Sequence, residues 1–373
     1  MSNTDPNPQE QVCVNGPHTT EGLRDGVTLA ASGVEILEPR EVPLGGPRAM
    51  TVRRTIPQRA RSLVGAWCFL DFYGPDDLTE ATPMRVPRHP HTGLATVSWL
   101  FSGRIDHTDS AGNWATVRPG DVALMNAGRG ISHSEHSTED TTILHGAQLW
   151  YAFPEEHRFV EPSLDSHRAE PVTGPGWQAT VFIGELLGAA SPVHTYIPLT
   201  AAELRLEPGA VMDIEVPAGH EHGLLQVSGD VRLNGDQIPT DHLGVVDVGA
   251  TSLRVEAGDE PVLALLIGGQ PLGEKIVMWW NFVGRSHAEI AAYRAAYQAE
   301  MGFEAPEESS PLSRRLGFDD ALGAPVFGEL RDELAGAAYD DGRPFPQFGD
   351  FPPGQEAPLP APALPSTRMK PRG

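Results

Sequence analysis

The segment 93–149 alternates short apolar runs with turn residues, and this pattern constrains the fold more than any other feature of the chain. Runs rich in β-forming residues, such as 94–101 and 122–125, are separated by Gly, Pro, Asp and Asn. Short strands that recur about every eight to twelve residues are typical of an antiparallel sandwich or barrel. A second region with this pattern spans 180–269. We therefore predict an all-β chain with two antiparallel β-barrel or jelly-roll domains and a few short helices.

One of these helices has a clear start signal. Ser286 is a good N-cap residue, and Glu289 stands three positions later, as in a capping box. Apolar residues then recur at helical spacing as far as Met301. We expect a helix near 287–301 that covers one of the β domains.

Composition shifts suggest four parts of the chain, and each carries its own expectation. The tail beyond residue 344 is rich in Pro, so we expect it to be extended or disordered, unless 359–365 lies as a strap on the body. The parts are a poorly ordered N-terminal arm (1–45), a first domain (46–160), a second domain that includes the helix (161–302), and a Pro-rich C-terminal extension (303–373).

The overall composition excludes several classes of protein. The formal net charge of −23 opposes binding to nucleic acid, which requires a clustered basic surface. The two cysteines, Cys13 and Cys68, indicate no disulfide framework and suit a reducing compartment. The N-terminus lacks the pattern of a signal peptide, and no apolar run is long enough to span a membrane. We expect a cytoplasmic protein.

Two short segments place possible metal ligands at positions i and i+2. His89 and His91 form the first pair, and His133 and Glu135 form the second. Residues i and i+2 of a strand point to the same face, so two adjacent strands would aim these four side chains at one point. Three imidazoles and one carboxylate suit a divalent transition metal and leave coordination positions open. The spacing also fits unrelated histidines in the core or on the surface.

Other histidines compete for this role. His107 precedes Asp109 in a predicted turn, and we expect it to make local hydrogen bonds. His136 would point to the opposite face from Glu135. We expect His145 to be a core histidine. The alternative is that it contacts one of the metal ligands and so orients that ligand.

Taken together, six motifs resemble the pirin family of bicupins, and they occur in order over residues 50–153. The region 180–295 is similar to the C-terminal domain of that family, but more loosely. The motifs are His89-Pro90-His91-Thr92-Gly93, Thr96-Val97-Ser98-Trp99-Leu100, His107-Thr108-Asp109-Ser110-Ala111-Gly112-Asn113, Pro119-Gly120-Asp121-Val122, Ala127-Gly128-Arg129-Gly130-Ile131-Ser132-His133-Ser134-Glu135 and His145-Gly146-Ala147-Gln148-Leu149-Trp150.

This resemblance implies two β-barrel domains, with iron, Fe(2+), in the first. The ligands of the family fall on His89, His91, His133 and Glu135, which are the residues that the spacing selects. The second domain has one i,i+2 pair, His220 and His222, but no return pair, so we expect it to be structural. The same ligands would also accept Mn, Ni, Co, Cu or Zn.

Three functions are compatible with the resemblance. The first is a flavonol (quercetin) 2,3-dioxygenase-type oxygenase, in which Glu135 takes a proton from the flavonol and O2 is the second substrate. Apolar residues around Trp99, Leu124, Met125 and Trp150 could wall an aromatic ligand, although most are expected to be core. The second function is a non-enzymatic, iron-dependent regulator that binds a protein partner. The third is a binding or stress-response bicupin with vestigial activity.

Overall fold

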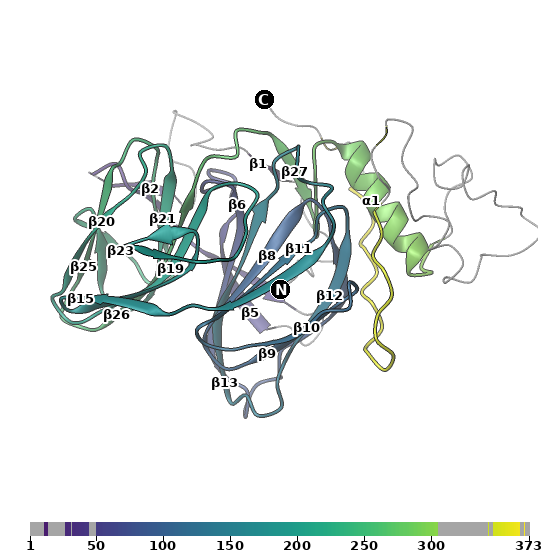
Figure 1. Cartoon of the computed structure of the whole chain (residues 1–373), viewed down its shortest axis with the longest axis horizontal. Coiled ribbons are helices and arrows are strands. Elements are labelled where there is room, and N and C mark those ends of the chain that lie inside the picture. The colour runs from purple at the N-terminus through teal and green to yellow at the C-terminus, as the bar shows by residue number, and fades with distance from the viewer. Residues whose placement is uncertain are drawn as a thin grey trace, which may run out of the picture.

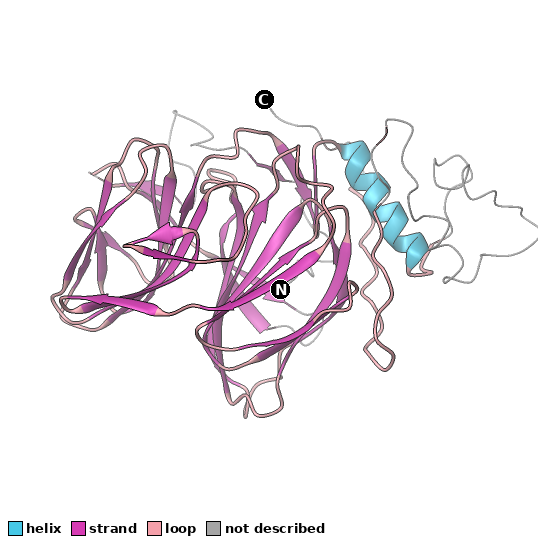
Figure 2. Cartoon of the chain, viewed as in Figure 1, coloured by secondary structure: helices cyan, strands magenta, loops and turns pink. Residues whose placement is uncertain are grey.

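The structure is a computed structural model of the chain, and it describes residues 11–13, 27–30, 32–44, 50–304, 342, 346–365 and 369. Strands dominate these residues, and they contain a single α-helix, α1 (His287–Glu300) (Figure 2). The expectation of an all-β fold is confirmed. Where we expected a few short helices, the described connections are mostly turns and short loops. No helix among the described residues has the length and apolar character needed to cross a membrane.

The first domain consists of two antiparallel sheets whose strands are not consecutive in sequence (Figure 1). The smaller sheet has the order β10 (Trp114–Val117), β9 (Ile105–Asp109), β12 (Ile131–Ser137) and β7 (Arg85–His91). The larger sheet has the order β14 (Ser163–Arg168), β11 (Asp121–Asn126), β8 (Leu94–Ser102), β13 (Ile143–Ala152), β6 (Trp67–Asp77), β5 (Met50–Ile56) and β4 (Arg40–Leu44).

The second domain repeats this plan with a large and a small sheet. The large sheet has the order β15 (Pro171–Gly174), β16 (Trp177–Ile183), β19 (Leu199–Leu206), β26 (Val262–Gly269), β21 (Glu221–Ser228), β24 (Leu243–Val246), β3 (Glu35–Leu37) and β2 (Val27–Leu29). The small sheet has the order β20 (Val211–Glu215), β25 (Ser252–Ala257), β22 (Val231–Leu233) and β23 (Asp236–Ile238).

Two minor sheets complete the described strands. One joins β1 (Gln11–Cys13), β27 (Ile276–Trp279) and β28 (Phe282–Gly284), and the other is the hairpin of β17 (Glu185–Leu186) and β18 (Ala189–Ala190).

The part of the chain that we expected to be a poorly ordered arm contains strands wherever it is described. Strand β3 extends the large sheet of the second domain, whereas β4 extends the large sheet of the first. Val34 and Leu37 are buried, so apolar contact fixes this segment despite the polar residues around it. Within residues 35–44, for which we expected poor order, the structure has the strands β3 and β4. The rest of the arm, apart from 11–13, 27–30 and 32–34, lies outside the described residues.

The boundary between the two domains also differs from the one that we predicted at residue 160. Strand β14 pairs with β11 along its whole length, so the first domain extends to Arg168. The polar sequence of β14 has a mostly half-exposed side-chain pattern, as expected for a strand at the edge of a sheet. It therefore carries little of the apolar signal by which a strand is recognised in sequence.

The two large sheets pack face to face and share one apolar core. Trp99 on β8 stacks on Phe182 on β16, with ring centroids 4.2 Å apart and an angle of 9° between the planes. The Trp99 indole N–H also donates to Oε2 of Glu203 at 2.8 Å. Because the large sheets face each other, the small sheet of the first domain lies on the side away from the second domain.

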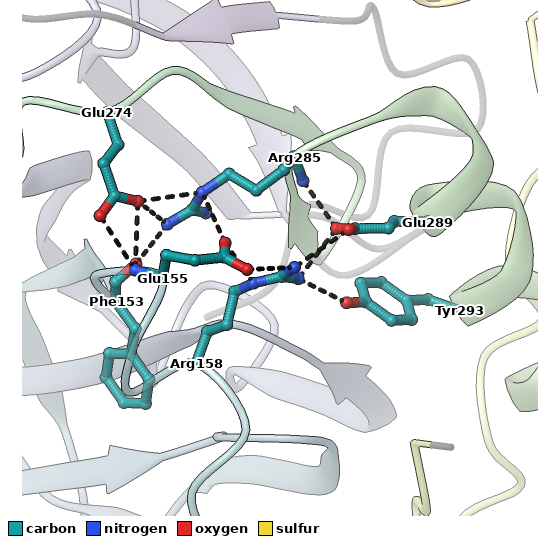
Figure 3. Close-up of polar contacts among 7 residues, drawn as sticks. All are labelled: Phe153, Glu155, Arg158, Glu274, Arg285, Glu289 and Tyr293. Atoms are coloured by element: carbon teal, nitrogen blue, oxygen red, sulfur yellow. Dashed lines mark hydrogen bonds and ion pairs between the residues drawn. The ribbon is translucent and has the colours of Figure 1, made fainter. Parts of the chain in front are cut away.

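Helix α1 packs beside the first domain, at the end of the molecule opposite the second domain (Figure 1). Ser286 caps it by accepting a hydrogen bond from the Glu289 N–H at 3.2 Å. The Glu289 carboxylate accepts from the backbone N–H of Arg285, the residue before the N-cap, at 2.8 Å, and from Arg158 at 2.9 and 3.0 Å (Figure 3). Arg158 also donates to the Tyr293 hydroxyl at 3.1 Å. This buried cluster fastens the helix to the first domain.

Candidate metal centre

The two segments with i,i+2 spacing lie on neighbouring antiparallel strands of the small sheet. On β7 and β12, His89 is directly opposite His133, and His91 is opposite Ile131. The register shifts between His133 and Glu135, so the ladder is irregular at this point. The side chains of the four predicted ligands are all buried at 1 % exposure or less.

Three of the four predicted ligands converge directly. One ligand atom from each of His89, His91 and His133 lies within 4.8 Å of the others. The Nε2 atoms of His91 and His133 are 3.1 Å apart. At most one of these two nitrogens can donate to the other, whereas a shared cation would accept a lone pair from both. The three imidazoles therefore form the core of the site.

Glu135 belongs to a second, overlapping group. Its carboxylate lies within 4.8 Å of ligand atoms of His107 and His133, so the two groups share His133. The Ser98 hydroxyl lies 3.1 Å from Oε1 of Glu135 and 2.9 Å from Oε1 of Gln148. Ser98 and Gln148 belong to the large sheet, so the carboxylate touches both sheets of the domain.

Burial keeps the three imidazoles neutral, as metal ligation requires. Desolvation lowers the pKa of His89 to about 3. Desolvation, reinforced by the neighbouring imidazole of His89, holds the pKa of both His91 and His133 well below the usual value. The Nδ1–H of His89 donates to the Pro87 carbonyl at 2.8 Å, so its lone pair is on Nε2. That Nε2 is buried and has no hydrogen-bond partner.

His107 takes a larger part than the sequence suggested. It lies on β9 rather than in a turn, and besides the expected local contact with Asp109 it faces His133. Its Nδ1 is 3.3 Å from Nδ1 of His133, and its Nε2 is 3.4 Å from Oδ2 of Asp109. Burial alone would raise the pKa of Asp109, but hydrogen bonds from His107 and Asn113 outweigh it and lower the pKa.

The ionised Asp109 determines which ring nitrogens of His107 and His133 donate hydrogen bonds. A carboxylate only accepts, so Nε2 of His107 donates to Asp109, and in the corresponding tautomer Nδ1 of His107 is an acceptor. His133 then donates from Nδ1 and keeps a lone pair on Nε2, which is the atom nearest to His91. His107 and Asp109 repeat the i,i+2 spacing of the two ligand pairs, and that spacing was the signal that could have identified them.

Of the remaining candidates, His145 and Trp99 have their ring contacts elsewhere, whereas Trp150 contacts this group. The half-buried His145 ring packs between Phe72 and Phe101, with centroids 5.3 and 4.9 Å away. Trp99 points into the interface between the domains. The Trp150 ring packs edge-on against the His91 ring, with centroids 5.0 Å apart. Of Trp99 and Trp150, the two aromatic residues suggested as a wall, Trp150 is therefore the one that contacts a predicted ligand.

The single pair in the second domain gathers no further ligands among the described residues. The rings of His220 and His222 are 6.2 Å apart, and neither belongs to a group of three possible ligands. Burial lowers the pKa of both imidazoles, that of His222 to about 4. The first domain is therefore the place where a metal fits.

The chemistry of the donor set agrees with a transition metal. Neutral imidazoles with a carboxylate nearby suit Fe, Mn, Co, Ni, Cu or Zn, and neither group of ligands among the described residues contains a cysteine to favour a structural zinc site. Held by three nitrogens and one oxygen, such an ion would keep coordination positions for small ligands.

Comparison with known proteins agrees with this arrangement. Residues 49–151 match the Pirin family, and residues 201–303 match the Pirin C-terminal cupin domain. A Pseudomonas aeruginosa protein, provisionally named a quercetin 2,3-dioxygenase, is 37 % identical over 73 % of this chain and 88 % of its own length. Human Pirin is 33 % identical over 61 % of this chain and 82 % of its own length.

A solved structure extends the similarity to most of the chain. The crystal structure of a quercetin 2,3-dioxygenase from Acinetobacter baumannii matches 90 % of this chain and 98 % of its own, with a TM-score of 0.73 and 29 % identity. The two-domain arrangement, the paired ligand strands and these matches identify the chain as a member of the pirin family of bicupins.

Proposed function

We propose that this chain is a mononuclear iron bicupin of the flavonol (quercetin) 2,3-dioxygenase type that acts in the cytoplasm. The observation that carries the proposal is the convergence of three fully buried imidazoles from β7 and β12. In the proposal His89, His91, His133 and Glu135 hold Fe(2+). The names of the Pseudomonas and Acinetobacter relatives support the choice of a flavonol and O2 as substrates.

The bound ion would supply Lewis acidity toward the 3-hydroxyl and 4-carbonyl of a flavonol and a place for O2. Glu135 is the residue that we expect to take the proton from the 3-hydroxyl. The contact with Ser98 ties one oxygen of Glu135 to the large sheet, so the carboxylate keeps its direction while it exchanges a proton. The edge of Trp150 would lie beside an aromatic ligand bound near His91.

The first prediction concerns metal content and turnover. We expect the wild type to hold about one iron per chain and to bleach quercetin absorbance under air. His89→Ala should lose both the metal and the turnover, because two imidazoles and a carboxylate bind a divalent ion far more weakly. Glu135→Gln should keep much of the metal but lose turnover at least ten-fold, because an amide does not take up the proton.

His145→Gln is the matched control, since this histidine belongs to the same domain but packs between two phenylalanines. It should retain both metal and turnover. Bleaching that is equal in the wild type and in His89→Ala would exclude catalysis at this site. A wild type that binds iron but leaves quercetin unchanged would favour the alternative, an iron-dependent regulator, and pulldowns with the Fe(II) and Fe(III) forms would then test for a protein partner.

A further inference from the structure

Strand β7 carries two of the proposed ligands but stands at the edge of its sheet. In the order β10-β9-β12-β7, only β12 pairs with it along its length. That ladder is itself irregular, because the register shifts beside Glu135. An edge strand with an interrupted ladder is held less firmly than a central strand. The spacing of the imidazoles across β7 and β12 therefore needs further support.

Two later segments of the chain cover the open edge of β7. The Val283 N–H of β28 donates to the Thr92 carbonyl at 3.1 Å, and the Leu359 N–H donates to the Arg88 carbonyl at 2.8 Å. Thr92 and Arg88 flank the His89-Pro90-His91 segment. Backbone bonds from the C-terminal half thus hold this edge on both sides of the ligands.

The segment 346–365, which we call the strap, also joins the two ligand strands through side chains. Arg88 donates from Nε to the Ser132 hydroxyl at 2.8 Å, across from β7 to β12. The carbonyl of Phe348 accepts from Ser132 Oγ at 2.6 Å and from Arg88 at 3.2 Å. Arg88 also donates to the Gly349 carbonyl. One point of the strap therefore binds both strands at once.

These contacts lie directly behind the imidazoles. Arg88 precedes His89, and Ser132 precedes His133, so their side chains take the opposite face of the sheet from the ligands. The Arg88 guanidinium also lies over the Phe351 ring, 4.9 Å from its centroid. A planar guanidinium can bind a hydroxyl and two carbonyls together, whereas an ammonium cannot match that geometry.

The strap is in turn fixed to helix α1. The Glu300 carboxylate accepts from the backbone N–H groups of Phe348 and Gly349 at 2.8 and 2.7 Å. The Tyr297 hydroxyl donates to the Leu359 carbonyl at 2.8 Å. Phe348 is fully buried against the Tyr297 ring. In Figure 1 the yellow strap passes between the first domain and α1, and the cluster in Figure 3 fastens that helix to the first domain.

We propose that the strap is a positioning element of the metal centre, and that Arg88 and Ser132 are its positioning residues. They fix β7 against β12 and so keep the His91 and His133 nitrogens at a spacing that retains the ion. This inference rests on the metal site proposed above. The strap lies beyond residue 303, where the match to the pirin domains ends, so metal retention in this chain depends on a segment outside both family matches.

The test uses Co(II) as the probe, because its visible absorption reports coordination geometry. We compare full-length wild type with Arg88→Lys, Ser132→Ala and the matched control Arg85→Lys. Arg85 lies on the same strand, and its exposed side chain pairs with Glu356 of the strap at 3.1 Å, a single ion pair that lysine also makes. Release of Co(II) to excess EDTA should be at least ten-fold faster in Arg88→Lys and several-fold faster in Ser132→Ala. Both variants should show a shifted absorption spectrum, and Arg85→Lys should match the wild type.

The outcomes separate the two proposals. A wild type that binds neither Co(II) nor Fe(II) overturns the proposed site. A wild type that binds Co(II), with Arg88→Lys unchanged in both release rate and spectrum, overturns the inference and leaves the site intact. A variant that is only less stable, with wild-type release and spectrum, also overturns it. If Arg88→Lys does not fold, Ser132→Ala decides by the same two measurements.

Discussion

At the residue scale, the buried imidazoles link the metal centre to the stability of the fold. Histidine in an unfolded chain has a pKa near 6.5. Burial lowers the pKa of His89 to about 3, and it holds those of His91 and His133 well below the usual value. Below about pH 6.5 the unfolded chain therefore binds protons that the folded, metal-free chain does not.

The second prediction follows from the sign of this difference. The free energy of unfolding of the metal-free protein should fall as the pH falls from about 6.5 toward 3, because acid stabilises the unfolded state. Each such histidine adds up to about 1.4 kcal/mol per pH unit. Urea unfolding at pH 7, 6 and 5 should show a shallower decline for His91→Gln than for the wild type. Parallel curves would show that His91 titrates alike in the folded and unfolded chains.

Strand periodicity explains what the sequence predicted at this scale. The i,i+2 rule is local, so it correctly put His89 with His91, and His133 with Glu135, on common faces of two strands. It could not determine which other strand lies beside them. Only the pairing of β9 with β12 brings His107 to His133.

At the element scale, helix α1 depends on a long-range ion pair as well as on its own sequence. The start signal at Ser286 predicted where the helix begins, since capping is a local property. The partner of Glu289 is Arg158, 131 positions earlier in the chain, and no local pattern indicates that contact. Both side chains are under 10 % exposed, and Arg158, which also pairs with the more exposed Glu155, is the cation bound to the buried Glu289 carboxylate.

The third prediction is that Arg158→Met destabilises the protein by about 3 kcal/mol, because it leaves the Glu289 carboxylate buried without its cation. Urea unfolding gives the magnitude, and hydrogen exchange should show the largest loss of protection in α1. Arg129→Met is the matched control, since its partner Glu161 is 75 % exposed. It should cost less than about 1 kcal/mol. Equal losses in the two variants would contradict a special role for the Arg158 cluster.

At the scale of the whole molecule, charge as well as apolar contact joins the two domains. Arg61 is fully buried in the first domain, and its guanidinium contacts the carboxylates of Glu35, Glu221 and Asp247 from the second. Burial raises the pKa of Glu35, and the attraction of Arg61 opposes that rise. The sequence indicated two β domains, but it gave no sign that the N-terminal strands divide between them, because β3 is short and β24, which joins it to the large sheet, lies far along the chain.

The fourth prediction is that Arg61→Met weakens this interface by roughly 3–5 kcal/mol, because it removes the cation from a group of three carboxylates. Calorimetry of the wild type should show one unfolding transition, and the variant should unfold at a lower temperature, with the two domains separating into distinct transitions. Arg254→Met, which alters an exposed ion pair with Asp213 in the second domain, is the control. A single, unshifted transition in Arg61→Met would show that apolar contact alone couples the domains.

The segments that cover the edge of β7 are synthesised after the proposed ligands, which determines the order in which the site is assembled. A ribosome makes the chain from its N-terminus, so all four proposed ligands emerge before β28 and long before Leu359. The ligand strands can pair during synthesis, yet the backbone bonds that shield their outer edge form only after Val283 and, later, Leu359 have been made. A newly made chain would therefore acquire its ligands early and the enclosure around them last.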